Sequence, residues 1–197
     1  MYLKQRIINS ALPNPQTLTI IVSLLATLGV FLELLGGIWD ASSHAVRAPE
    51  QFWSIQHVVV YSGVGIVVTS SILGFLMLNK KIISGKTNTA IKIIILGSIL
   101  QIVAGYGDSI SHDIYGIDGL ISWSHQPLEL GLVLSALGGY LLLSDRKNDL
   151  FKKLTPVSIF AVLASSCWLA FSLSLFVSAI PVCTLVYEIF SSGCAVL

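Results

Sequence analysis

Every histidine of the chain belongs to one of two copies of the same pattern, Asp-x3-His-x12-His. The copies are Asp40, His44 and His57 and, 68 residues later, Asp108, His112 and His125. Because the chain has only four histidines, an aspartate has histidine at both offsets by chance roughly four times in ten thousand. Two complete copies therefore indicate an internal duplication.

Two imidazoles and one carboxylate, with positions left for water or substrate, are a ligand set that suits zinc, copper or non-haem iron. On a helix, residues four apart share one face, so the aspartate and the first histidine of each copy point toward one place. The twelve residues that follow let the chain leave this helix, turn and begin the next, with His57 or His125 near its start. The sequence predicts two metal sites or one binuclear centre. For each copy, the alternative is an Asp–His hydrogen bond without metal.

Further polar residues accompany the motifs. Glu33 lies on the helical stripe that leads to the first motif, and Gln101 stands at the equivalent position of the second copy. Glu129 follows the last histidine by one turn, where the first copy has Tyr61. An acid at the centre of a membrane helix costs about 2.5 to 3.5 kcal/mol. We expect these four residues to orient the ligands or to line a pathway, and the alternative for Glu33 is a polar contact between helices.

The composition is that of a membrane protein. Hydrophobic residues make up 54% of the chain and charged residues 11%, with a mean hydropathy of +0.85, whereas a soluble domain has about 25% charged residues. Five apolar runs are long enough to cross roughly 30 Å of hydrocarbon. These runs are Thr17 to Trp39, Ile55 to Leu78, Thr89 to Tyr106, Ser122 to Leu143 and Val157 to Ser178. The basic residues are few and are explained by the membrane topology, which gives no support to nucleic-acid binding.

We therefore expect an all-α bundle of five membrane-spanning helices in one domain. Two parallel helical hairpins, about residues 17–78 and 89–143, form the repeats, and the fifth span, about residues 156–178, has no counterpart. Pro156 suits the start of this span. After Pro181, the segment to Phe190 is either a kinked extension or an interfacial helix, followed by the C-terminal residues to 197. Because the fifth span has no histidine, its expected role is packing or complex formation.

The distribution of charge predicts an orientation. Ten of the eleven lysines and arginines lie at the N-terminus or around the second and fourth connections, and only Arg47 lies elsewhere. An excess of basic residues marks the cytoplasmic side. The N-terminus is then cytoplasmic, and both motifs face the opposite side of the cell membrane.

At the motif residues the chain resembles the C subunit of the copper membrane monooxygenases, the particulate methane and ammonia monooxygenases. That subunit is similar in having an Asp-x3-His-x12-His copper site on a helix pair, which Asp40, His44 and His57 match. Asp108, His112 and His125 match a second set of the family, in which the aspartate position is Asn. The resemblance covers about residues 30–135. It implies copper, dioxygen activation with an external reductant, and partners that include the lipid bilayer and other subunits of such a complex. The chain is also similar to other membrane proteins with the same duplicated pattern.

Other functions fit the same residues. In a membrane-embedded hydrolase, zinc would lower the pKa of bound water toward about 7, with Glu33 or Glu129 as the general base. In a metal carrier or proton pathway without catalysis, Glu33 and Gln101 would line the conduit. A purely structural subunit is the fourth possibility.

Overall fold

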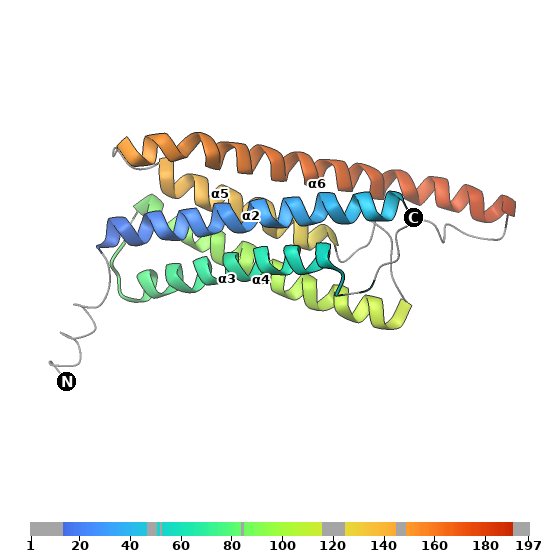
Figure 1. Ribbon diagram of the computed structural model, residues 1–197, viewed down its shortest axis with the longest axis horizontal. Coiled ribbons are helices and arrows are strands. Elements are labelled where there is room, and N and C mark those ends of the chain that lie inside the picture. The colour runs from blue at the N-terminus through green and yellow to red at the C-terminus, as the bar shows by residue number, and fades with distance from the viewer. Residues whose placement is uncertain are drawn as a thin grey trace.

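The computed structural model describes residues 14–46, 51, 53–83, 85–115, 125–144 and 149–190, without the side chains of residues 44, 45, 111–115 and 179–190. The described part forms five long helices that run along one axis (Figure 1). They are α2 (Pro15–Ala45), α3 (Ile55–Asn79), α4 (Gly85–Tyr115), α5 (His125–Ser144) and α6 (Asp149–Phe190). All five are long and apolar enough to cross a membrane, which confirms the predicted all-α membrane bundle.

The apolar runs form helices because only a helix satisfies every backbone group within one segment of a membrane. α2 begins where Asn14 accepts a hydrogen bond from the backbone N–H of Gln16 at 3.0 Å, and Pro15 occupies the first helical position, where no N–H is needed. Before α3, the backbone N–H of Gln51 donates to the hydroxyl of Ser54 at 2.8 Å. This bond lies one turn before His57 and thus holds the backbone from which the motif histidine extends.

The first four helices form two hairpins that close into a ring. α2 packs along α3 and α4 along α5, while α2 also contacts α5 and α3 contacts α4. Glycines allow the same close crossing in both hairpins. A Cβ atom added at Gly63 would lie 2.7 Å from the carbonyl oxygen of Gly29, and one at Gly131 would lie 2.6 Å from that of Gly97. Since both glycine pairs are related by the 68-residue offset of the motifs, the duplication extends to helix packing. We call α2 and α3 the first repeat and α4 and α5 the second.

Small residues also carry hydrogen bonds between the helices. The hydroxyl of Ser23 donates to the carbonyl oxygen of Gly139 at 2.7 Å, which joins α2 to α5. Ser70 of α3 donates to the carbonyl oxygen of Val22 at 2.7 Å. In an environment without water, such bonds hold neighbouring helices in register.

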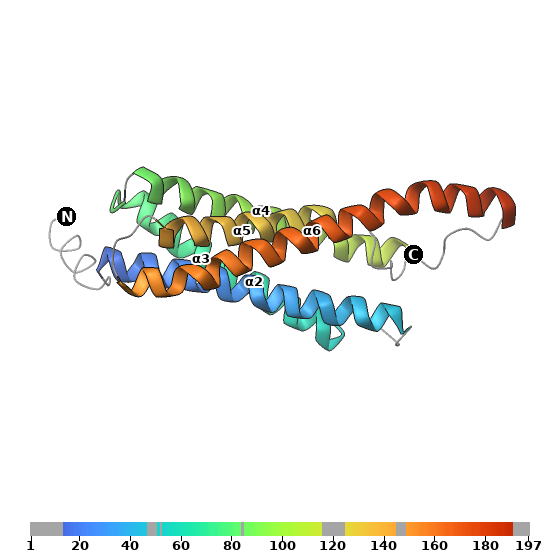
Figure 2. The same ribbon diagram turned by 90° about the horizontal axis from the view of Figure 1, so that it is seen from above.

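α6 lies across one side of the ring. It packs on α5 and α2 and crosses both in the view of Figure 2, on the side of the bundle opposite to α3 and α4 (Figures 1 and 2). The expected start at Pro156 is wrong, since α6 begins at Asp149. The additional turns are stabilised by packing, because Phe151 is only 1% exposed. At the other end, α6 runs through Pro181 to Phe190 as one helix, so the segment is an extension of the fifth span.

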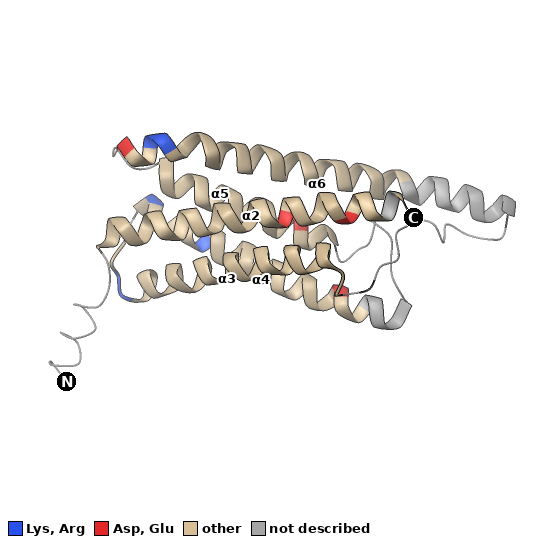
Figure 3. Cartoon of the chain, viewed as in Figure 1, with Lys and Arg blue, Asp and Glu red and all other residues tan. Residues whose placement is uncertain are grey.

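Among the described residues, the lysines gather toward one end of the bundle, where Asp149 also lies, while the other acidic residues lie away from that end (Figure 3). Lysines gather where α3 ends and where α4 and α6 begin, whereas the acidic residues of the first four helices lie in the half that contains the motifs. The hairpin topology alone requires that both motifs reach the same end, because each repeat contains two antiparallel helices.

Candidate metal centre

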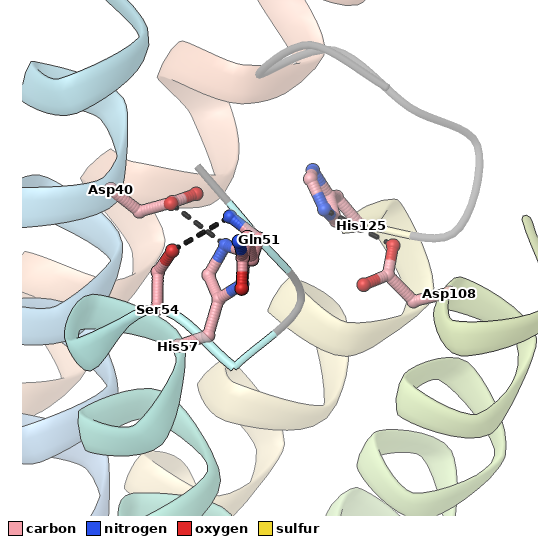
Figure 4. A network of polar contacts seen from close by, with 6 residues as sticks. All are labelled: Asp40, Gln51, Ser54, His57, Asp108 and His125. Atoms are coloured by element: carbon pink, nitrogen blue, oxygen red, sulfur yellow. Dashed lines mark hydrogen bonds and ion pairs between the residues drawn. The ribbon is translucent and has the colours of Figure 1, made fainter. Parts of the chain in front are cut away.

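Each motif brings an aspartate near the end of one helix opposite a histidine at the start of the next. His57 is the third residue of α3 and His125 the first of α5, as the twelve-residue spacing predicted. The Nε2 atom of His57 lies 2.8 Å from Oδ1 of Asp40. In the second repeat, Nε2 of His125 lies 3.2 Å from Oδ1 of Asp108. The two repeats thus build the same pair of groups, as Figure 4 shows.

Both pairs line a single cavity, which we call the inner cavity. Its wall includes Asp40 and His57 from the first repeat and Asp108 and His125 from the second. Tyr61 lines it as well and lies within electrostatic range of both aspartates. The volume of about 70 Å³ has room for several water molecules, because a cavity needs roughly 10–15 Å³ to hold one water. The two motifs therefore converge on one place rather than forming two distant sites.

The distances within the pairs fit ligands of one ion. Metal bonds to imidazole nitrogen and carboxylate oxygen are about 2.0–2.2 Å long, so two neighbouring ligand atoms lie roughly 2.8–3.5 Å apart. The separations of 2.8 and 3.2 Å fall within this range. The same separations fit a direct hydrogen bond from Nε2–H to the carboxylate, which is the alternative that the sequence left open.

The other two predicted ligands lie outside the described side chains. His44 belongs to α2 and His112 to α4, each one turn after the aspartate of its motif. Their approach to the pairs stays a prediction. Among the side chains that are described, no group of three or more histidine, cysteine, aspartate and glutamate residues has the arrangement of a metal site.

Glu33 and Gln101 meet in the interior of the ring. Glu33 is 3% exposed and Gln101 is fully buried, and their side chains face each other. In the described part of the chain, none of their four polar atoms makes a hydrogen bond of good geometry. Glu33 lines the inner cavity, in agreement with the expectation that an intramembrane acid faces a partner or a cavity.

Glu129 and Tyr61 occupy equivalent positions of the two repeats and both line the inner cavity. Glu129 lies close to His125 and to two residues of α6, Trp168 and Ser172. The ring of Tyr61 is 6.3 Å from that of His57. Each motif histidine thus has a different neighbour one turn away, a carboxylate in one repeat and a phenol in the other.

α6 contributes to the site in a way that the sequence did not reveal. Trp168 lines the inner cavity and covers Gly37, where an added Cβ would lie 3.3 Å from the indole ring. Ser172 accepts a hydrogen bond from Nε2 of Gln126 at 2.9 Å. The glycine at position 37 gives no signal of this cover, because it recurs as Gly105, where nothing among the described residues lies within 4 Å of an added Cβ. The fifth span therefore does more than pack against the other helices, because it also lines the cavity.

Comparison of the chain with models of known protein families, with curated proteins and with solved structures found no match. The motif residues and the cavity that they share are therefore the features that indicate a function.

Proposed function

We propose that this protein is an integral membrane metalloprotein that binds copper at the shared cavity of its two repeats. The ligands are Asp40, His44 and His57 in the first repeat and Asp108, His112 and His125 in the second. The protein acts within, or as a relative of, a copper membrane monooxygenase. The observation that carries this proposal is that two copies of one carboxylate–imidazole pair, from separate hairpins, line one cavity.

The type of ligand favours copper among the candidate metals. Imidazole nitrogen suits copper, zinc and iron, and the motif contains no sulfur ligand. Copper has the highest affinity of the divalent first-row metals for such a set, and the resemblance of the motif to the monooxygenase C subunit points to the same metal. When bound, copper would supply dioxygen activation, with electrons from an external reductant.

The side chains of the site have separable tasks in this proposal. The two motifs hold the metal. Glu129 orients the imidazole of His125 from one turn away, because a carboxylate beside a ligating histidine fixes the ring and raises its basicity. Trp168 covers the cavity on the side of α6. This cover keeps the polar groups away from lipid and confines a substrate to small molecules.

The orientation belongs to the same proposal. The lysine-rich end faces the cytoplasm, and the motif end faces the opposite side. The lipid bilayer is the first partner, and other subunits of a monooxygenase complex would supply the reductant.

Metal content per chain tests the assignment. Protein purified in native membranes is analysed for copper, zinc and iron, together with the variants His44→Ala and His112→Ala. We expect each variant to lose metal and the double variant to hold none, because each substitution removes one of three ligands. Val58→Ala is the control, since Val58 is adjacent to His57 but 44% exposed. Unchanged metal stoichiometry in both histidine variants would exclude the site.

A zinc-dependent membrane hydrolase is the second candidate. It is favoured by one observation, which is that Glu33 and Glu129 line the cavity beside the Asp–His pairs. A carboxylate in this position can take a proton from metal-bound water. Zinc in place of copper in the purified protein, with an activity that proceeds without dioxygen, would establish this function and contradict the first.

A further inference from the structure

A second cavity lies between α3 and α4 and shares a wall with the first. This outer cavity has a volume of about 280 Å³ and an almost entirely apolar lining. It is larger than the apolar cavity of roughly 150 Å³ that binds benzene or xenon in another protein. Its lining includes Trp53, Tyr61, Gln101, Gly105 and Leu128.

The outer cavity is the repeat-related counterpart of the part of the inner cavity next to α6. The 68-residue offset relates Gly105 to Gly37 and Gln101 to Glu33. On the α6 side, the indole ring of Trp168 covers Gly37. On the other side, nothing among the described residues lies within 4 Å of a Cβ added at Gly105. The duplicated ring therefore has two equivalent seams, of which α6 closes only the one between α2 and α5.

Tyr61 and Leu128 separate the two cavities, because both side chains line each of them. Tyr61 makes an edge contact with Trp53 on the outer side, at a ring separation of 6.1 Å. On the inner side, its ring lies 6.3 Å from that of His57. Of the two separating side chains, Tyr61 is the one that contacts aromatic rings on both sides, Trp53 in the outer cavity and His57 in the inner one.

Gln101 indicates the chemistry of a ligand for the outer cavity. Its carboxamide is fully buried, lines this cavity and faces the carboxyl group of Glu33. Within the described part of the chain, neither its nitrogen nor its oxygen makes a hydrogen bond of good geometry. A buried amide whose hydrogen bonds are incomplete is costly, and a ligand that can donate or accept one hydrogen bond would reduce this cost. A charged ligand is excluded, because a charge in an apolar wall costs far more.

We propose that the outer cavity is a lateral entrance, through which small uncharged molecules with one hydrogen-bonding group pass from the bilayer to the inner cavity. Gly105 leaves the opening free, Gln101 binds the polar group in transit, and Tyr61 is the gate. As a route for a substrate, the entrance rests on the proposed function, and it restricts that substrate to molecules that dissolve in the membrane. The route itself is testable without metal.

Cysteine modification in lipid nanodiscs tests the route. The three native cysteines are replaced by serine, and Leu132→Cys supplies a reporter, because Leu132 lines the inner cavity and is 2% exposed. The reagents are methyl methanethiosulfonate, which is small and uncharged, and its charged sulfonatoethyl analogue. The thiolate attacks the sulfenyl sulfur, a mixed disulfide forms and a sulfinate leaves, so mass spectrometry gives the rate of modification.

We expect Gly105→Leu to slow modification by the uncharged reagent by about tenfold or more, because a leucine side chain fills the opening. Gly107→Leu is the matched control. Gly107 lies on the same helix, also has nothing within 4 Å of an added Cβ and does not line either cavity, so its rate should not change. Tyr61→Ala should raise the rate and gives a second readout if Gly105→Leu fails to fold.

Three results would overturn the entrance. They are equal rates in Gly105→Leu and its parent, equally fast modification by the charged reagent, and no modification of the reporter at all in the parent. Ser42→Cys, which is exposed at the motif end of α2, verifies in the cysteine-free chain that both reagents are active in the same nanodiscs. None of these results affects the metal content, so failure of the entrance and failure of the metal site are distinguishable.

Discussion

The buried Glu33–Gln101 pair places one carboxyl group beside one amide in the interior of a membrane bundle. Burial of a second carboxyl group at the same place would be costly, since two acids that face each other cannot both be ionised at low cost. The free-energy cost of a substitution therefore differs between the two positions. An amide can replace the acid, but an acid cannot replace the amide.

Exchange variants test this asymmetry. Gln101→Glu should destabilise the folded protein by about 2–3 kcal/mol, the cost of an additional buried acid, whereas Glu33→Gln should leave stability unchanged or raise it. Reversible unfolding in mixed detergent micelles measures both. Equal destabilisation by the two substitutions would show that shape, and not charge, determines this contact.

At the scale of helices, the two glycine crossings hold each repeat together. Alanine at Gly63 or Gly131 would bring its methyl group within 2.6–2.7 Å of the facing backbone oxygen, which forces the helices apart. We expect Gly63→Ala and Gly131→Ala each to destabilise the protein by about 1–3 kcal/mol, as overpacking does.

Gly65→Ala is the control for these variants. It lies on the same helix as Gly63, but nothing is within 4 Å of its added methyl group. Alanine there should be neutral or stabilising by up to about 1 kcal/mol, because alanine has the higher helix propensity. A similar loss of stability in all three variants would contradict the close crossing as the cause.

The sequence predicted the helices better than their ends. The length of each apolar run predicted five spans because hydropathy reports burial in lipid. Three helices continue well past the ends of their apolar runs, α2 to Ala45, α4 to Tyr115 and α6 to Phe190, since a helix that leaves the hydrocarbon keeps its backbone hydrogen bonds. α6 begins earlier than predicted because Phe151 is buried. No local sequence pattern predicts this burial.

The sequence predicted residues of the site only within the two repeats. The motif spacing placed His57 and His125 at helix starts, opposite their aspartates. Trp168 could not be found in this way, because α6 has no counterpart in the repeats and an aromatic residue in an apolar span has many possible neighbours. Convergence of both pairs on one cavity depends on how the hairpins pack, which is a property of the tertiary structure.

For the molecule as a whole, the separation of charges predicts its direction in the membrane. With the native cysteines removed, Ser42→Cys at the motif end should react with a membrane-impermeant thiol reagent added outside intact cells. Lys86→Cys at the basic end should react only after the cells are opened, because basic residues stay on the cytoplasmic side. Both positions are exposed in the structure. The reverse pattern of labelling would invert the orientation and place the metal cavity toward the cytoplasm.

The facing side chains of Glu33 and Gln101 also bear on how such a protein can arise. A symmetric dimer of identical hairpins would carry the same residue on both sides of its axis, either two acids or two amides, and could never set one against the other. Fusion of the two hairpins into one chain removes that restriction, so each half can mutate alone. The unequal centre of this bundle is thus a property that a homodimer of one hairpin cannot acquire.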